Sequence, residues 1–349
     1  MTSINQFALS RRARPLQAGF TLVEIMVGLA IGLLATLVIM QVFSNFEAQN
    51  RTTTSSADAQ TNGSIALYNI SSEMQTAGYP LTSSTTSSPL KCTTLTFGST
   101  GLTGISPVTI ADGGTGASDS ITLRYGTTAA GGIASTITAV GSPNPNDVTI
   151  DSSLGCNTND VALITNGTTC AMTRATAVTS SVPATITLQD TTSVVVGATV
   201  ACLGNWNEVT YAVNNGKLER NGVPTVDGIV DLQAQYGVSS SATSNQVVQW
   251  VDATGSTWAA PTVTDRNKIK AIRIAIVARS AQRDPATVTT ACSSTITASP
   301  SGLCAWSGSA SSPAPTIDLS GDPNWQHYRY RVFETIIPLR NVIWSKDSL

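Results

Sequence analysis

The longest hydrophobic pattern in the chain lies near its N-terminus. From Ile25 through Phe46, about 22 residues pass without a charge, and a helix of that length can cross a hydrocarbon core of ~30 Å. The first 19 residues carry three arginines and no acid: Arg11, Arg12 and Arg14. The pattern predicts a membrane-spanning helix with a cytoplasmic N-terminus, because basic flanks stay on the cytoplasmic side.

The leader differs from a secretory signal peptide, in which an apolar core of about 7 to 15 residues is followed by the cleavage site. Here Gly19 precedes the apolar run, so cleavage after it would leave the helix on the mature protein, with everything after Arg51 outside. Glu24 lies just before this uncharged run, inside the apolar stretch that starts at Phe20, where an acid costs about 2.5 to 3.5 kcal/mol at the helix centre and less near an end. The α-amino group of a new N-terminal Phe20, on this chain or a neighbour, would be its counter-charge.

Residues 47–77 continue as an amphipathic helical pattern. Its apolar positions step by three, four and three residues and share one face: Leu67, Ile70, Met74 and Ala77. Gly78 and Pro80 predict the end of the helix. Poor helix formers at residues 52–56 and Gly63 predict fraying or bending within it.

From Lys91 onward, short stretches alternate with period two between turn signals, as half-buried antiparallel strands do. The clearest strands are residues 268–279, with isoleucines on one face, and 328–337. Residues 213–218 predict a tight hairpin around Asn-Gly. Three segments rich in Ser, Thr, Gly and Pro predict exposed loops: 82–88, 112–118 and 295–315.

Composition narrows the class of protein. Only 11% of the 349 residues are charged, less than half of the ~25% usual in soluble domains. The formal net charge of −2 provides no basic field for gathering nucleic acid, so we expect no nucleic-acid partner. With a single histidine, His327, and no CxxC or GxSxG pattern, we expect no enzyme, metal site or cofactor.

All six cysteines follow the apolar run: Cys92, Cys156, Cys170, Cys202, Cys292 and Cys304. An even count in an exported domain predicts disulfides. Proximity in sequence predicts the pairs Cys156–Cys170 and Cys292–Cys304, which leaves Cys92–Cys202, although six cysteines allow 15 pairings.

Several other segments match binding motifs only in part. Residues 112–116 are glycine-rich but lack the lysine and the helix of a phosphate-binding loop. Gly28 and Gly32 form a GxxxG pattern, which either packs against another helix or reflects the small residues common in apolar helices. Acids without EF-hand spacing are expected to be ordinary loop acids: Asp147, Asp151 and Asp160. Three C-terminal arginines are expected on a solvated or subunit-facing surface and not on DNA: Arg329, Arg331 and Arg340.

The succession of an arginine-rich leader, Gly19, Phe20, three further residues, Glu24 and an uncharged helix resembles the class III signal of type IV pilins and pseudopilins. The resemblance implies that a prepilin peptidase cuts after Gly19 and N-methylates Phe20. It also implies that Glu24 pairs with the N-terminus of a neighbouring subunit during assembly. The alternative is an ordinary signal anchor with a chance glutamate. The helix lacks the kinking proline of many major pilins, so whether it melts locally in a fibre, as theirs do, stays an open question.

The size of the chain and three later passages, residues 69–80, 226–238 and 328–341, resemble PilW-type minor pilins. This implies an α+β pilin-like fold, in which a long N-terminal helix, transmembrane and then amphipathic, packs on an antiparallel β-sheet-rich, disulfide-bearing C-terminal domain. It implies a structural subunit that joins other minor pilins and the major pilin at the inner-membrane assembly platform. There it would prime assembly at or near the tip, with a tip adhesin, and serve adhesion, twitching motility and DNA uptake.

The predicted division of the chain has four parts: a cleaved leader at 1–19, a transmembrane assembly helix at 20–46, the amphipathic exterior half of the helix at 47–80 and a periplasmic or extracellular β-rich domain at 81–349. Two alternatives come from other classes. A type II secretion pseudopilin would share everything through Glu24 but usually has a smaller exterior domain. A membrane-anchored periplasmic enzyme or receptor would need a convergent polar site.

Overall fold

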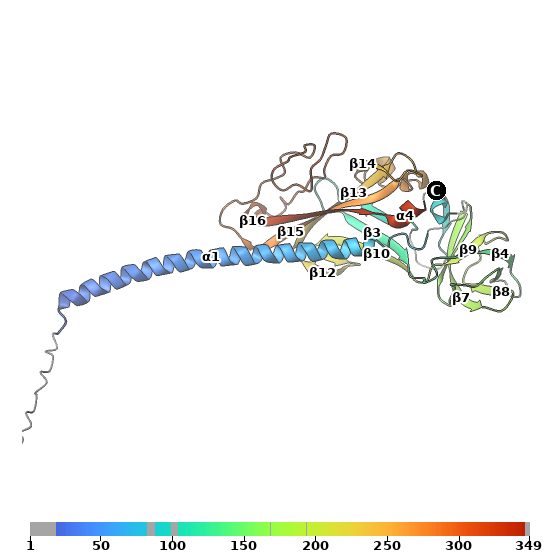
Figure 1. Cartoon of the computed structure of the whole chain (residues 1–349), viewed down its shortest axis with the longest axis horizontal. Helices are drawn as coiled ribbons and strands as arrows, with labels where there is room; N and C mark the ends of the chain where they lie inside the picture. The colour runs from blue at the N-terminus through green and yellow to red at the C-terminus, as the bar shows by residue number, and fades with distance from the viewer. Residues whose placement is uncertain (1–18, 82–87, 99–103, 168, 193, 346–349) are drawn as a thin grey trace, which may run out of the picture. The chain divides into compact units, whose positions relative to one another are not determined.

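The computed structural model describes residues 19–81, 88–98, 104–167, 169–192 and 194–345. The chain divides into two compact units, Met1–Thr53 and Thr54–Leu349. Helix α1 (Leu22–Met74) starts in the first unit and continues into the second, and it is helical at residues 52–56 and Gly63, where fraying or bending was predicted. The long helix and a β-rich domain with disulfides confirm the expected α+β class (Figure 1).

The described part of the second unit contains three β-sheets. The four-stranded sheet has the order β14-β13-β15-β16, with β13 (Ile229–Ser239), β14 (Val247–Val251), β15 (Ile269–Arg283) and β16 (Tyr328–Pro338). The five-stranded sheet has the order β12-β11-β10-β3-β2, with β2 (Val108–Ala111), β3 (Ser120–Gly126), β10 (Trp206–Asn214), β11 (Lys217–Arg220) and β12 (Val223–Asp227). The seven-stranded sheet contains β1 (Thr94–Thr96), β4 (Ala134–Val140), β5 (Asp147–Ile150), β6 (Val161–Asn166), β7 (Thr169–Thr179), β8 (Ala184–Leu188) and β9 (Thr199–Cys202). Short helices connect them: η1 (Pro89–Lys91), α2 (Gly255–Trp258), α3 (Val263–Arg266), η2 (Trp325–His327) and α4 (Arg340–Trp344).

The part of α1 that belongs to the second unit packs on the four- and five-stranded sheets. Its buried stripe confirms the predicted one and extends it toward the N-terminus: Ala59, Ala66, Ile70, Met74 and Ala77, with Leu67 at the edge. Gly63 lies in the same stripe, and a Cβ there would overlap the ring of Phe333 on β16. The glycine therefore allows helix and strand to approach closely.

The four-stranded sheet is covered on both faces. On β15, Ile272, Ile274 and Ile276 face the core beneath α1, as predicted, whereas Ala275 and Val277 face a second cluster. That cluster is built from the segment predicted as an exposed loop at 295–315. The prediction is wrong for Leu303, Ala305, Trp306 and Ala314, which are buried against the sheet, whereas Ile296 is exposed as predicted. Of the predicted loop at 82–88, residues 82–87 lie outside the described residues.

The predicted hairpin at 213–218 is confirmed by the register of β10 and β11, in which Asn214 pairs with Lys217. The two residues between them, Asn215 and Gly216, both have positive φ, of 49° and 73°. A two-residue loop with this backbone matches the twist of the strands it joins.

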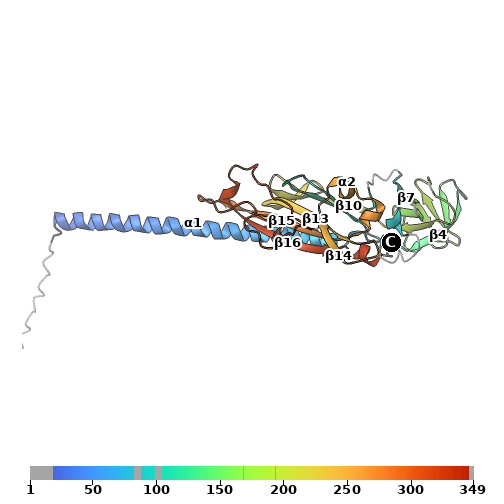
Figure 2. The ribbon, with the colours of Figure 1, turned by 90° about the horizontal axis from the view of Figure 1, so that it is seen from above.

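The seven-stranded sheet closes on itself. Its antiparallel strands follow the order β7-β6-β9-β4-β5-β8, and β8 pairs back with β7, which makes a barrel; β1 adds to β7 in parallel. The interior is filled by small and branched side chains, among them Ala162, Ile164 and Ile186. In both views the barrel lies at one end of the second unit (Figures 1 and 2).

The barrel is an insertion in the five-stranded sheet. It occupies the chain between β3 and β10, whose ends Gly126 and Trp206 are directly paired. Strand β6 is buried on both faces, because Ala162 and Ile164 point into the barrel while Val161 and Leu163 join a cluster with Trp206. This second cluster docks the barrel on the rest of the unit.

The disulfides correct two of the three predicted pairs. Cys292–Cys304 is confirmed, but the others are Cys92–Cys170 and Cys156–Cys202 in place of Cys156–Cys170 and Cys92–Cys202. Sequence proximity failed because pairing of β1 with β7 sets Leu95 opposite Cys170 and so brings Cys92, 78 residues away in sequence, beside it.

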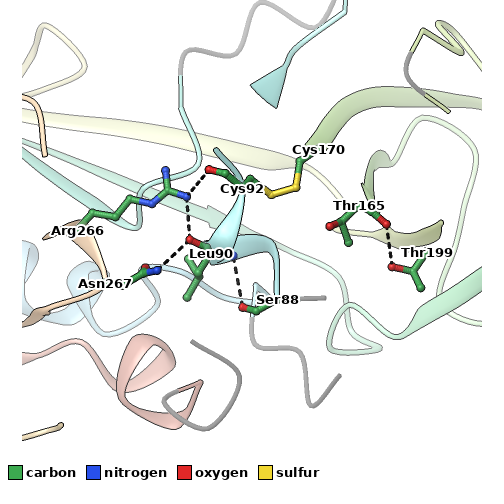
Figure 3. Close-up of a disulfide and its surroundings, with 8 residues drawn as sticks. All are labelled: Ser88, Leu90, Cys92, Thr165, Cys170, Thr199, Arg266 and Asn267. Carbon is green, nitrogen blue, oxygen red and sulfur yellow. Dashed lines mark hydrogen bonds between the residues drawn. A yellow bond between two sulfur atoms is a disulfide. The ribbon is translucent and has the colours of Figure 1, made fainter. Parts of the chain in front are cut away.

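The segment before Cys92 is fixed from its other side as well. Arg266 Nη2 donates to the carbonyl oxygens of Leu90 (2.9 Å) and Cys92 (3.1 Å), and Asn267 Nδ2 donates to Leu90 O (3.1 Å), as Figure 3 shows. The Cys92–Cys170 disulfide thus links the barrel to a segment held by the chain at the end of α3.

Candidate functional site

Helix α1 begins with a hydrogen-bonded cap made by Glu24, a predicted site residue, and Thr21. The backbone N–H and the hydroxyl of Thr21 both donate to Glu24 Oε2 at 3.0 Å, and the Glu24 N–H donates to Thr21 Oγ1 at 3.2 Å. This reciprocal arrangement is a capping box. The Thr-x-x-Glu spacing was visible in the sequence, but the prediction assigned Glu24 only a partner in another subunit.

Gly19 and Phe20 precede the helix, and Phe20 is 85% exposed. Most of the predicted leader, residues 1–18, lies outside the described residues. The peptide bond at which cleavage is predicted therefore lies just outside the first helical turn, next to the capping box.

The apolar run presents its side chains outward in the isolated chain. The most hydropathic 18-residue window of α1 has a mean hydropathy of 2.5 with none of its residues buried, so this helix is long and apolar enough to cross a membrane. Gly28 and Gly32 belong to this surface, and a Cβ at either would meet nothing within 4 Å. Packing of another helix against these glycines stays a prediction.

A second polar site lies at the other end of α1, where Glu73 meets the five-stranded sheet. Arg220 on β11 donates from Nε to Glu73 Oε2 (3.1 Å) and from Nη2 to Oε1 (2.6 Å). The hydroxyls of Tyr125 on β3 and Tyr211 on β10 donate to Oε1 (2.7 Å) and Oε2 (2.6 Å). Each carboxylate oxygen thus accepts two hydrogen bonds, and the arginine contact is bidentate.

These donors set the charge of Glu73. Burial acts to raise the pKa of Glu73, but hydrogen bonds from Arg220, Tyr211 and Tyr125 and the charge of Arg220 outweigh it and lower the pKa to about 2. Burial and the hydrogen bond to Glu73 raise the pKa of Tyr211. A carboxylate with all its acceptor positions filled and such a low pKa does not take up a proton near neutral pH. The site therefore holds the end of α1 on the sheet and is unsuited to acid–base catalysis.

An open pocket of about 490 Å³ lies over this ion pair. Tyr68, which is 70% exposed, and Asn69 contribute from α1. Because of this opening, the side chain of Arg220 keeps 41% of its surface exposed while that of Glu73 keeps 15%. Sequence reasoning missed the site, since nothing in the pattern connects Glu73 with an arginine 147 positions later.

The other predicted candidates lie in ordinary structural settings. His327 ends the short helix η2, and its Nδ1 lies 3.0 Å from the carbonyl oxygen of Asp284. Asp147 accepts hydrogen bonds from Asn144 and Thr187. Arg329 pairs with Asp284 at 2.9 Å, while Arg331 and Arg340 are exposed. Within the described ranges, no three His, Cys, Asp or Glu side chains gather as a metal would require.

Two segments of the chain match models of known protein families. A family model for type IV pilus-assembly protein W matches residues 204–341, from just before β10 to the start of α4. A model for the prokaryotic N-terminal methylation motif matches residues 14–40, which include the capping box and most of the apolar run. No curated protein and no solved structure matches the chain significantly.

Proposed function

Because the chain belongs to the type IV pilins, and among them to the PilW type of minor pilin, we propose that it is a structural subunit that primes pilus assembly at or near the tip. It is a membrane-anchored pilin, through the apolar part of α1. The observation that supports the proposal most strongly is the succession of Gly19, Phe20 and the Glu24 capping box at the start of an apolar run whose most hydropathic 18-residue window has no buried residue.

The first step is processing. A prepilin peptidase cuts after Gly19 and methylates the new N-terminal Phe20. Accessibility supports this step, because Phe20 is exposed and precedes the helix. The arginines of the leader keep this end on the cytoplasmic side of the inner membrane. The disulfides support a periplasmic location for the rest of the chain, since they persist in oxidising compartments.

The second step is assembly. The apolar helices leave the bilayer and bundle, so that the exposed side chains exchange lipid for neighbouring helices. Glu24, which caps its own helix in the single chain, then faces the Phe20 amine of a neighbouring subunit. The partners are other minor pilins and the major pilin on the inner-membrane assembly platform, with an adhesin at the tip. Adhesion, twitching motility and DNA uptake are the activities that such a fibre serves.

Substitutions at the capping box test the role of Glu24. We expect Glu24→Val to insert into the membrane at the wild-type level but to lose co-purification with the other minor pilins from detergent extracts. Thr21→Val is the matched control, because it removes the hydroxyl of the cap and leaves the carboxylate. Normal recovery of the partners with Glu24→Val would contradict the proposal, and equal losses in both variants would assign Glu24 to capping alone.

A further inference from the structure

A buried joint connects the five-stranded sheet to the four-stranded sheet. The segment at residues 112–119, between β2 and β3, is hydrogen-bonded along the start of β13. The Asp119 N–H donates to Leu232 O (2.8 Å), the Ala234 N–H donates to Asp119 Oδ2 (2.8 Å), and the Leu232 N–H donates to Ser118 Oγ (3.0 Å). Gln233 Nε2 adds a bond to Ala117 O at 2.9 Å. The predicted exposed loop at 112–118 is therefore bound to a strand.

Two carboxyl groups are enclosed in this joint. Asp119 is 4% exposed and Asp231 is 1% exposed. Asp119 Oδ1 accepts from the Gly113 N–H (3.0 Å), and both oxygens of Asp231 accept from Gln233 Nε2 (3.1 and 3.2 Å). Among the described residues, no lysine, arginine or histidine donates to either carboxyl group. Their donors are all neutral, so nothing in the joint offsets two negative charges.

The ionisable groups around the joint increase this cost. Burial raises the pKa of Asp119 to about 7, and the negative charges of Asp112 and Asp252 act in the same direction, against hydrogen bonds from Gly113 and Ala234. Burial raises the pKa of Asp231 to about 7 as well, with Asp119 adding to the effect. Arg124 on β3 does not offset this cost, because its charge acts on another group: burial raises the pKa of the nearby Tyr236 on β13, and Arg124 acts to lower it, as does the Ile110 N–H that the Tyr236 hydroxyl accepts.

We propose that this joint is a pH-sensitive latch: it is closed while at least one of the two carboxyl groups keeps its proton, and it loosens as both ionise. The direction follows from proton binding. The closed state holds its protons more tightly than the open state, in which each aspartic acid has its ordinary pKa of 3.8. The closed latch is therefore most stable in acid, and its stability falls as the pH rises from about 4 to about 7. Above about pH 7 its stability does not change further.

Loosening would reach beyond the 112–119 segment. The Asp318 N–H donates to Gly116 O (3.0 Å), and Gln235 Nε2 bridges Asp252 Oδ1 and Pro313 O at 2.8 Å each. Residues 313–318 cover the outer face of the four-stranded sheet through Ala314 and Ile317. The latch thus controls how firmly both the 112–119 segment and this cover are held.

Hydrogen exchange by mass spectrometry on the full chain in detergent micelles tests the latch. After correction for the intrinsic exchange rate, we expect protection of peptides spanning 113–119 and 231–234 to fall between pH 5 and pH 7, by up to about tenfold per pH unit for each group that ionises. Protection in the centre of β15 should stay unchanged, which separates local opening from global unfolding.

Asp231→Asn removes one of the two ionising groups and keeps the side-chain shape, so the logarithm of its protection should fall with about half the wild-type slope across the same pH range, because Asp119 still ionises. Asp318→Asn is the matched control, because Asp318 is an exposed acid beside the same segment, and it should follow the wild type. A wild-type protection that does not change with pH would overturn the proposal. An Asp231→Asn protein whose protection falls with pH as steeply as that of the wild type would also overturn it. If Asp231→Asn does not fold, the pH dependence of the wild-type protection still tests the proposal.

Discussion

Two carboxylate sites in the second unit show what decides the charge of a buried acid in this protein. At the end of α1, Glu73 is only 15% exposed, yet four hydrogen bonds, two of them from Arg220, lower its pKa to about 2. In the joint between the sheets, Asp231 is 1% exposed and receives neutral donors, and burial raises its pKa to about 7. Asp231 is also the more deeply buried of the two, so the depth of burial and the charge of the donors together set the difference.

The two sites also connect different parts of the fold. Glu73 fixes a helix to a sheet and keeps its charge across the neutral and mildly acidic pH range, because its pKa is lowered to about 2. Asp119 and Asp231 connect a loop to a strand and change charge near neutral pH. A permanent attachment and a conditional one therefore lie within the same unit, and three measurements can separate them.

The largest expected effect is at the permanent attachment. Glu73→Ala should lower the free energy of unfolding by about 2 to 4 kcal/mol, because Arg220 and two tyrosyl hydroxyls lose their acceptor. Urea unfolding of the full chain in micelles, followed by tryptophan fluorescence, measures this. The double variant Glu73→Leu with Arg220→Met leaves no charge unpaired and should recover part of the loss. A change below about 0.5 kcal/mol in Glu73→Ala would show that the ion pair does not hold the helix.

An intermediate effect is expected from acid. The folded pKa of Glu73 is lower than its ordinary 4.5, so its contribution is complete above pH 4.5 and is lost as the pH falls toward 2. Asp119 and Asp231 have the opposite sign, and their contribution grows as the pH falls from 7 toward 3.8. Urea midpoints in half-unit steps should show Glu73→Gln losing less stability than the wild type below pH 4.5. Parallel curves for the two proteins in that range would contradict the assignment.

The smallest effects concern single hydrogen bonds of the Glu73 site. Tyr211→Phe should cost about 1 to 1.5 kcal/mol, because Tyr211 is 2% exposed, and Tyr125→Phe should cost less because its side chain is only partly buried. Asp227→Asn, which removes the exposed partner of Lys217, is the control and should leave the urea midpoint unchanged. A larger loss in Tyr125→Phe than in Tyr211→Phe would reverse the proposed order.

Features with local causes could be predicted from the sequence. The apolar run, the stripe through Ile70 and Met74, the hairpin at Asn215 and the isoleucine face of β15 all follow from the spacing of neighbouring residues. The Cys292–Cys304 pair belongs with them, since only 12 positions separate the two cysteines.

Features with distant partners could not be predicted. The Cys92–Cys170 pair depends on β1 lying beside β7, and closure of the barrel depends on β8 meeting β7, neither of which a periodicity encodes. Gly63 was interpreted as a weak point of the helix, because the residue that requires a glycine there, Phe333, lies 270 positions away in the sequence. The Glu73 site and the buried acids need three or more segments to be in place before their chemistry appears.

The position of the barrel has a consequence for how such a chain can change. Gly126 and Trp206 are paired neighbours on adjacent strands, so the ends of the insertion are held together by the sheet and not by the barrel. The cost of closing a loop grows only with the logarithm of its length. Because the sheet already supplies the closure, the length of the chain inserted at this point adds little to the free energy of closing it.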